Sequence, residues 1–157
     1  MFKTIIWATD GSETADRALP YAQGLAEGKD KTLVAVHVKE LFVGRGGGYP
    51  VHADEDELVA KIEAQVDEVR KAGVAVTLRC ATATAHGPAH FVAEIAKEVD
   101  ADVIVVGTRG HGPISGALLG SVAQHLLHDA HCPVLAIPPL KPEGVAETER
   151  ETVEAAR

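Results

Sequence analysis

The stretch GTRGHGPISGALLGS, residues 107–121, follows the apolar run Val103–Val106 and leads into a predicted helix that begins near Leu118. Glycine leaves backbone amides open to a ligand and adopts positive φ at little cost, as turns that cradle anions require. If the helix begins at Gly120 and Ser121, its unpaired amides and positive dipole end favour phosphate, and the Ser121 hydroxyl adds a donor. The stretch therefore predicts a strand, a phosphate-binding loop and a helix.

The same alternation of strand and helix fills the chain before this stretch and continues after it. Helical stripes with three- and four-residue spacing separate short apolar runs, and most of these runs are apolar on both faces. This pattern predicts a doubly wound α/β domain, in which a parallel sheet carries helices on both faces. The predicted strands are Thr4–Ala8, Thr32–Val38, Val74–Cys80, Val103–Val106 and Val134–Ile137.

Ligands of such folds bind outside the carboxyl ends of the strands, where the strand order reverses. The loops after the first and fourth strands, Asp10-Gly11-Ser12 and residues 107–121, are therefore the expected site. Residues 41–53, LFVGRGGGYPVHA, have a composition that favours a mobile loop or lid over regular structure.

Length and charge limit the class of protein. The chain has 157 residues, 46% of them hydrophobic, and a net charge of −8. These values predict one globular domain, placed over residues 1–140 and holding the predicted phosphate-binding loop, followed by an acidic, flexible tail over residues 141–157. The absence of a basic cluster argues against nucleic acid as a partner, and the absence of a long apolar run or signal peptide predicts a cytoplasmic protein that does not enter a membrane.

The sequence contains neither of two common phosphate-binding motifs. No glycine precedes a Lys-Ser or Lys-Thr pair, and the spacing after Gly110 and Gly112 departs from G-x-G-x-x-G. The stretch instead resembles the motif of the universal stress protein family, G-x2-G-x9-G-[ST], at Gly107, Gly110 and Gly120-Ser121. The segments TIIWATDGSETADRALPYA near the start and HCPVLAIP near the end also resemble that family, so the resemblance covers residues 3–138.

The resemblance implies a five-stranded parallel sheet in the order 3-2-1-4-5, a homodimer, and ATP bound with a divalent cation. It places Asp10 before the triphosphate, where a carboxylate requires Mg²⁺ or Mn²⁺ between the negative groups. Ala8, Thr9 and the backbone of Val38 are expected to line the adenine pocket. The expected contacts of the ribose and phosphates are Gly107, Arg109, Gly110, Gly120, Ser121 and Val122.

Several of these residues have simpler alternative roles. Asp10 could cap the first helix with help from Glu13, although Ser12 is also available for this. Arg109 could bind a phosphate or pair with a surface acid. His37, within an apolar strand, is interpreted as a hydrogen-bonded core residue.

The histidines and cysteines offer a metal site as a weaker hypothesis. The candidate zinc ligands are His125, His128, His131 and Cys132, or His86 with His90, and a zinc site needs three or four converging donors. Cys80 and Cys132 lie within or beside strands and are expected to be reduced and buried.

Binding is better supported than catalysis, because the spacing suggests no Ser-His-Asp or Cys-His arrangement. The predicted function is that of a dimeric, ATP-binding stress-response sensor or regulator, with at most slow ATP hydrolysis or autophosphorylation, for instance on Ser121. A nucleotide-free dimerisation or protein-interaction module is the alternative, and the signatures of an adenylyl-transferring enzyme are absent. Dimerisation through Val134–Ile137 is expected because an apolar edge strand favours pairing with a second copy.

Overall fold

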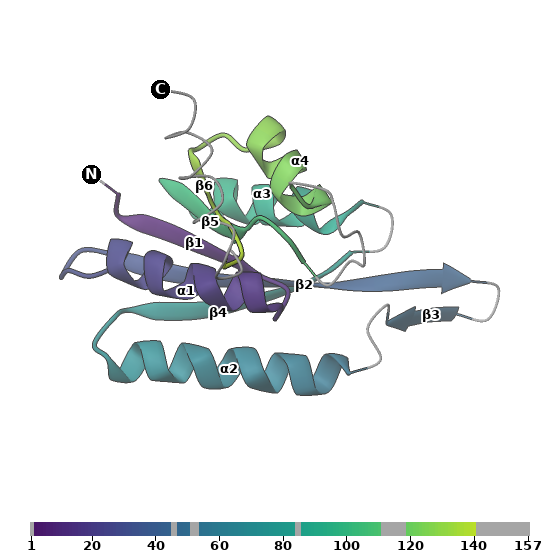
Figure 1. Cartoon of the computed structure of the whole chain (residues 1–157), viewed down its shortest axis with the longest axis horizontal. Helices are drawn as coiled ribbons and strands as arrows, with labels where there is room; N and C mark the ends of the chain where they lie inside the picture. Colours follow the sequence, from purple (N-terminus) through teal and green to yellow (C-terminus); the bar gives the residue numbers. More distant parts are fainter. Residues whose placement is uncertain (1, 45–46, 51–53, 84–85, 111–118, 141–157) are drawn as a thin grey trace, which may run out of the picture.

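The computed structural model describes residues 2–44, 47–50, 54–83, 86–110 and 119–140. Five parallel strands form its main sheet in the order β4-β2-β1-β5-β6, so the predicted doubly wound order 3-2-1-4-5 is confirmed (Figure 1). Their bounds are β1 Thr4–Thr9, β2 Thr32–Gly44, β4 Val76–Ala83, β5 Val103–Gly107 and β6 Val134–Ile137.

Helices cover both faces of this sheet, because its central strands are apolar on both sides. Helices α1 (Glu13–Leu25) and α2 (Glu55–Lys71) pack on one face, over a core that includes Ile5 and Trp7. Helices α3 (Pro88–Glu98) and α4 (Ser121–Asp129) pack on the other face, over a second core. Figure 1 shows the two pairs on opposite sides of the strands.

In the described parts of the segment predicted as a loop, residues 41–44 and 47–50, the structure has strands instead, and residues 45–46 and 51–53 lie outside the described residues. Strand β2 continues to Gly44, and β3 (Gly47–Pro50) pairs with it antiparallel, from Leu41 opposite Pro50 to Gly44 opposite Gly47. The apolar letters Leu41 to Val43 continue the strand, and the pairing then satisfies backbone groups that a loop would expose to water. In Figure 1 this hairpin extends beyond the carboxyl edge of the parallel sheet.

The prediction that both cysteines are buried is also wrong. Cys80 is exposed and Cys132 is half-buried, and both are free thiols. Cys80 lies on β4, which pairs only with β2 among the described strands, so one of its sides has no neighbouring strand to cover it.

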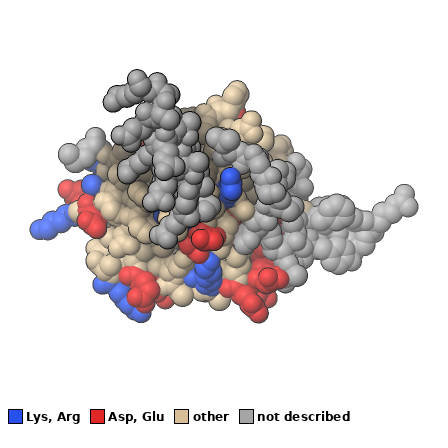
Figure 2. Space-filling model, in the orientation of Figure 1, with Lys and Arg blue, Asp and Glu red and all other residues tan. Residues whose placement is uncertain are grey.

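Charged side chains of both signs are mixed over α2 on the face shown in Figure 2. Within that helix Arg70 pairs with Asp67, and Lys71 pairs with Glu68 at 2.7 Å. Among the described helices, none has the length and apolar character needed to cross a membrane. The tail predicted over residues 141–157 lies outside the described residues.

Candidate nucleotide site

The turn after β1 is organised by its own side chains. The amide of Gly11 donates to Thr9 Oγ1 at 3.1 Å, and the amide of Ser12 donates to Asp10 Oδ1 at 3.0 Å. Gly11 has a φ of +74°, a left-handed conformation that glycine adopts without strain. These contacts place the Asp10 carboxylate at the carboxyl end of β1, the position at which doubly wound folds bind ligands.

Ser12, and not Asp10, caps helix α1. Its hydroxyl accepts a hydrogen bond from the amide of Ala15 at 3.3 Å, and the helix begins at the next residue, Glu13. The alternative role of Asp10 as the helix cap is therefore wrong. Its Oδ1 instead stabilises the turn, and its Oδ2 lies on the side of Gly110.

Two motif glycines bring the loop after β5 against this carboxylate. A Cβ on Gly110 would lie 2.4 Å from Asp10 Oδ2, and a Cβ on Gly120 would lie 3.2 Å from the Thr108 carbonyl oxygen. The amide of Gly120 donates to that same carbonyl at 2.6 Å. Glycine thus allows Gly110 to approach Asp10 and Gly120 to approach the backbone of residues 108–110, although residues 111–118 lie outside the described residues.

Helix α4 starts at this point. Gly120 is its N-cap and Ser121 its first residue, so the first amides of the helix have no partner within it. Ser121 is exposed and Val122 is half-buried. The positive end of the helix dipole and the unpaired amides are suited to an anion, and phosphate binding at this point stays a prediction.

Thr108 was not predicted as a site residue. Its Oγ1 is buried and has no hydrogen-bond partner among the described residues, although its backbone is bonded on both sides, to Ile137 and Gly120. A buried hydroxyl without a partner is costly, and a ligand that accepts from it would remove that cost. Its position between two motif glycines was the only signal in the sequence.

Gly107 has a packing role that needs no ligand. A Cβ at this position would lie 2.8 Å from the carbonyl carbon of Thr14 and 2.9 Å from the amide nitrogen of Ala15, both in the first turn of α1. The lack of a side chain therefore lets α1 rest directly on β5. Any contact of Gly107 with ribose or phosphate remains a prediction.

The residues predicted around adenine lie on different faces of the sheet. Ala8 and Val38 pack with the core under α3 and α4, so they share one apolar face. The Thr9 side chain bonds within the turn, and Arg109 is exposed. Ala8 and Val38 therefore belong to the same core, in which Ala8 is buried and Val38 is half-buried.

His37 is a bonded core residue, as predicted, and it links the turn to helix α2. It is 3% exposed, its Nδ1 lies 3.0 Å from the Thr9 carbonyl oxygen, and its Nε2 lies 2.7 Å from Glu55 Oε1. A cavity of about 290 Å³ adjoins this pair between α2 and the strands β2 and β4. Partial desolvation by the cavity wall raises the pKa of the Cys80 thiol, although the residue is exposed, and the negative charges of Glu63 and Glu55 raise it further, which disfavours the reactive thiolate.

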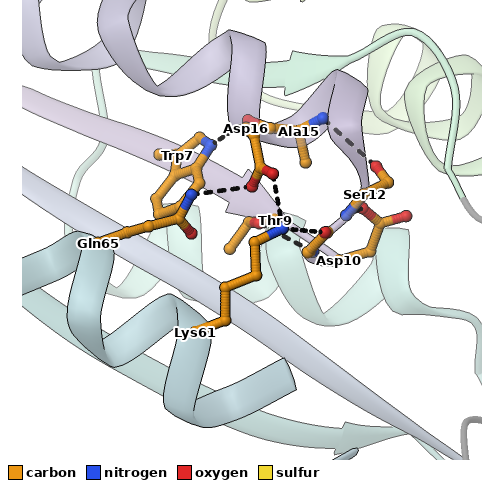
Figure 3. Close-up of polar contacts among 9 residues, drawn as sticks. Trp7, Thr9, Asp10, Ser12, Ala15, Asp16, Lys61 and Gln65 are labelled. Atoms are coloured by element: carbon orange, nitrogen blue, oxygen red, sulfur yellow. Dashed lines mark hydrogen bonds and ion pairs between the residues drawn. The ribbon is translucent and has the colours of Figure 1, made fainter. Parts of the chain in front are cut away.

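Lys61 of α2 contacts the turn from the same side (Figure 3). Its Nζ donates to the Gly11 carbonyl at 2.7 Å and to Asp16 Oδ2 at 2.6 Å. Gln65, one helical turn further on, donates to Asp16 Oδ1 at 2.9 Å. No sequence motif marked these residues, because their partners lie some 50 positions away in the chain.

The histidines considered as zinc ligands make other contacts. The rings of His86 and His90 lie 4.8 Å apart, and His125 Nδ1 lies 2.7 Å from the Ser121 carbonyl oxygen. Within the ranges that the structure describes, no three His, Cys, Asp or Glu side chains converge in a way that could hold a metal ion.

Comparison with known proteins agrees with this geometry. Residues 1–138 match the universal stress protein family. A universal stress protein of Thermus aquaticus is 36% identical over 140 residues, which are 87% of this chain and 99% of that protein.

Solved structures of the same fold include complexes with adenine nucleotides. A universal stress protein in complex with cAMP superposes with a TM-score of 0.62 at 26% identity, covering 87% of this chain and 97% of the other. The universal stress protein of Archaeoglobus fulgidus in complex with dAMP gives 0.61 at 28% identity, covering 87% and 98%. The match of residues 1–138 and the close relative in Thermus aquaticus establish that this chain belongs to the universal stress protein family.

Proposed function

We propose that this protein binds ATP together with Mg²⁺ or Mn²⁺ and acts as a dimeric stress-response sensor or regulator. The observation that carries the proposal is the meeting of three features at one edge of the sheet. These are the Asp10 carboxylate, the close approach of Gly110 and Gly120, and the first amides of α4. The family members in complex with cAMP and dAMP support an adenine nucleotide as the ligand.

The proposed roles follow from the chemistry of each group. The amides at the start of α4, with the Ser121 hydroxyl, would contact phosphate oxygens, and Gly110 and Gly120 would leave room for them. Ala8 and Val38 would provide an apolar wall for adenine. Asp10 is an oxygen donor of the kind that Mg²⁺ prefers, and the bound cation would supply the positive charge that allows a carboxylate and a polyphosphate to approach each other.

Any turnover of the nucleotide is proposed to be slow, because the cation would occupy Asp10, the carboxylate of the turn beside the proposed phosphates. A conformational signal on binding fits these residues better than a chemical step. The second candidate function is a nucleotide-free protein-interaction module. The packing role of Gly107 supports it, because the fold requires this motif glycine whether or not a nucleotide binds.

Calorimetric titration decides between the two functions. We expect ATP to bind the purified protein, and to bind at least about tenfold more tightly with Mg²⁺ than with EDTA, an effect of about 1.4 kcal/mol. Parallel titrations with ADP, AMP and cAMP rank the nucleotides. If none of the four binds at millimolar concentration, the nucleotide-free module is the better description.

The dimer is proposed to form through β6. The amides of Ile104 and Thr108 donate to the carbonyls of Pro133 and Ile137. In this register the backbone N–H and C=O groups of the alternate residues Val134 and Ala136 point away from β5. Leu135 is 37% exposed on the same strand. Antiparallel pairing with a second copy would satisfy the outward amides and cover this side chain.

The substitution Ala136→Pro tests this pairing. Proline removes an outward amide and keeps the hydrogen bonds from β5, so we expect a folded monomer, whereas the wild-type chain sediments as a dimer at micromolar concentration. Circular dichroism checks the fold of the variant. A dimer that persists in Ala136→Pro, or a wild-type monomer, would contradict pairing through β6.

A further inference from the structure

Two backbone carbonyls that flank Asp10 are held from outside the turn, one by His37 of strand β2 and one by Lys61 of helix α2. The carbonyl before it, of Thr9, accepts from His37 Nδ1 at 3.0 Å. The carbonyl after it, of Gly11, accepts from Lys61 Nζ at 2.7 Å (Figure 3). The backbone that carries the Asp10 side chain is therefore fixed at both ends by groups outside the turn.

His37 is itself fixed by α2. A carbonyl oxygen can only accept, so Nδ1 carries the hydrogen toward Thr9. The 2.7 Å contact between Nε2 and Glu55 Oε1 then holds a second proton, whichever of the two groups carries it. With both residues buried, at 3% and 4% exposure, the pair sets the orientation of the ring.

Lys61 is fixed in a similar way. Its ammonium is shared between the Gly11 carbonyl and Asp16 Oδ2, and Gln65 donates to the other oxygen of the same carboxylate. Figure 3 shows Lys61 and Gln65 reaching from α2 toward the start of α1, with Asp16 between them. Because these contacts cross from one helix to another, a shift of α2 changes the contact on the Gly11 carbonyl.

We infer that Lys61 is a positioning residue for Asp10, and that helix α2 sets the direction of the carboxylate through Lys61 and through the Glu55–His37 pair. The inference rests on the proposed function, in which Asp10 holds the cation. Asp10 Oδ1 is bonded to the Ser12 amide, so the carboxylate follows the backbone of the turn. Gly11, with its wide conformational freedom, gives that backbone little stiffness of its own.

Binding of the cation should be more sensitive to the position of Asp10 than binding of the nucleotide. Mg²⁺ demands near-ideal octahedral geometry at about 2.0–2.1 Å from its ligands, whereas several separate groups hold the nucleotide. A small displacement of Asp10 would therefore weaken the Mg²⁺-dependent part of ATP affinity and leave the remaining part almost unchanged.

Three variants of α2 lysines test the inference. Lys61→Met removes the donor, Lys61→Arg keeps a charged donor, and Lys71→Met is a matched control that removes an exposed lysine of the same helix. The quantity measured is the ratio of the ATP dissociation constant in EDTA to that in Mg²⁺. We expect Lys61→Met to lower this ratio by about 3- to 10-fold, the range for the net contribution of one typical hydrogen bond, with partial recovery in Lys61→Arg and no change in Lys71→Met.

A second readout needs no nucleotide. The Ser12 amide donates to Asp10 Oδ1, so its hydrogen exchange in the ligand-free protein reports how firmly the turn is held. We expect exchange about 3- to 10-fold faster in Lys61→Met than in Lys71→Met or the wild type, in line with the loss of one such bond.

The outcomes separate this inference from the proposed function. A wild-type protein that binds no ATP would overturn the proposed function, and the Ser12 exchange rate would still decide whether Lys61 holds the turn. A wild-type protein that binds ATP with Mg²⁺ dependence, together with an unchanged ratio and exchange rate in Lys61→Met, would overturn the positioning role. Equal weakening of ATP binding in EDTA and in Mg²⁺ would also overturn it, because the effect would then be one of net charge.

Discussion

Replacing Gly107 by alanine is expected to lower the free energy of unfolding by about 1–3 kcal/mol, the usual cost of forcing an extra methyl group into a packed interior. The new Cβ would lie 2.8–2.9 Å from backbone atoms of Thr14 and Ala15. Backbone cannot turn aside as a flexible side chain can, so α1 must move as a unit. That movement is opposed by the Trp7 indole, whose Nε1 donates to the Ala15 carbonyl at 2.9 Å.

Gly24→Ala is the matched control for this substitution. Gly24 lies within α1, and a Cβ there would meet nothing within 4 Å. Alanine should therefore stabilise the helix, by about 0.5–1 kcal/mol. Urea unfolding followed by circular dichroism measures both variants, and a Gly107→Ala chain as stable as the wild type would show that the glycine is not required for packing.

The result also bears on how the motif is interpreted. A family motif that is read as a ligand-binding signature implies that each of its glycines faces the ligand. Gly110 agrees with that view, since a side chain there would meet the Asp10 carboxylate, whereas a side chain on Gly120 would meet the Thr108 carbonyl. Gly107 faces α1 instead, so stability and nucleotide affinity should respond separately to changes at Gly107 and at Gly110.

The sequence was sufficient for the parallel sheet because each strand is a short apolar run between polar turns. Five such runs with helical stripes between them leave few topologies open, and the resemblance supplied the strand order. The same reasoning failed for residues 41–50, where glycine-rich composition suggested a loop and the backbone pairs as a hairpin. Composition records the preference of single residues, whereas pairing depends on a partner strand that only the fold supplies.

Those parts of the candidate site that are local in sequence could be predicted as structure. The Asp10 turn and the start of α4 each follow from a few adjacent letters. The contacts of His37 with Glu55 and of Lys61 with Gly11 join residues 18 and 50 positions apart, and neither pair forms a recognisable spacing. Nothing in a single sequence distinguishes Lys61 from Lys71, the other exposed lysine of α2, so its role could be found only in three dimensions.

Asp10→Asn is expected to change ATP affinity in opposite directions with and without Mg²⁺. Asparagine keeps the side-chain oxygen that accepts from the Ser12 amide, so this contact of the turn is preserved while the charge is removed. Without a cation, the wild-type carboxylate repels the phosphates, so its neutralisation should tighten ATP binding by about 3- to 10-fold. This estimate rests on a repulsion of about 1 kcal/mol between two unit charges roughly 4 Å apart in water.

With Mg²⁺ the expected change in ATP affinity has the opposite sign. The carboxylate then serves as a ligand of the cation, and an amide oxygen without a full charge is a weaker one, so affinity should fall by about tenfold or more. Calorimetry in EDTA and in Mg²⁺ gives both values for the variant and the wild type, with the Ser12 amide exchange as a check that the turn is intact. A purely structural role for Asp10 would shift the ATP affinity in the same direction in EDTA and in Mg²⁺. Shifts of equal sign in the two buffers would therefore contradict a cation bound by Asp10. Shifts of opposite sign are expected only for a carboxylate that lies between a metal ion and a polyphosphate.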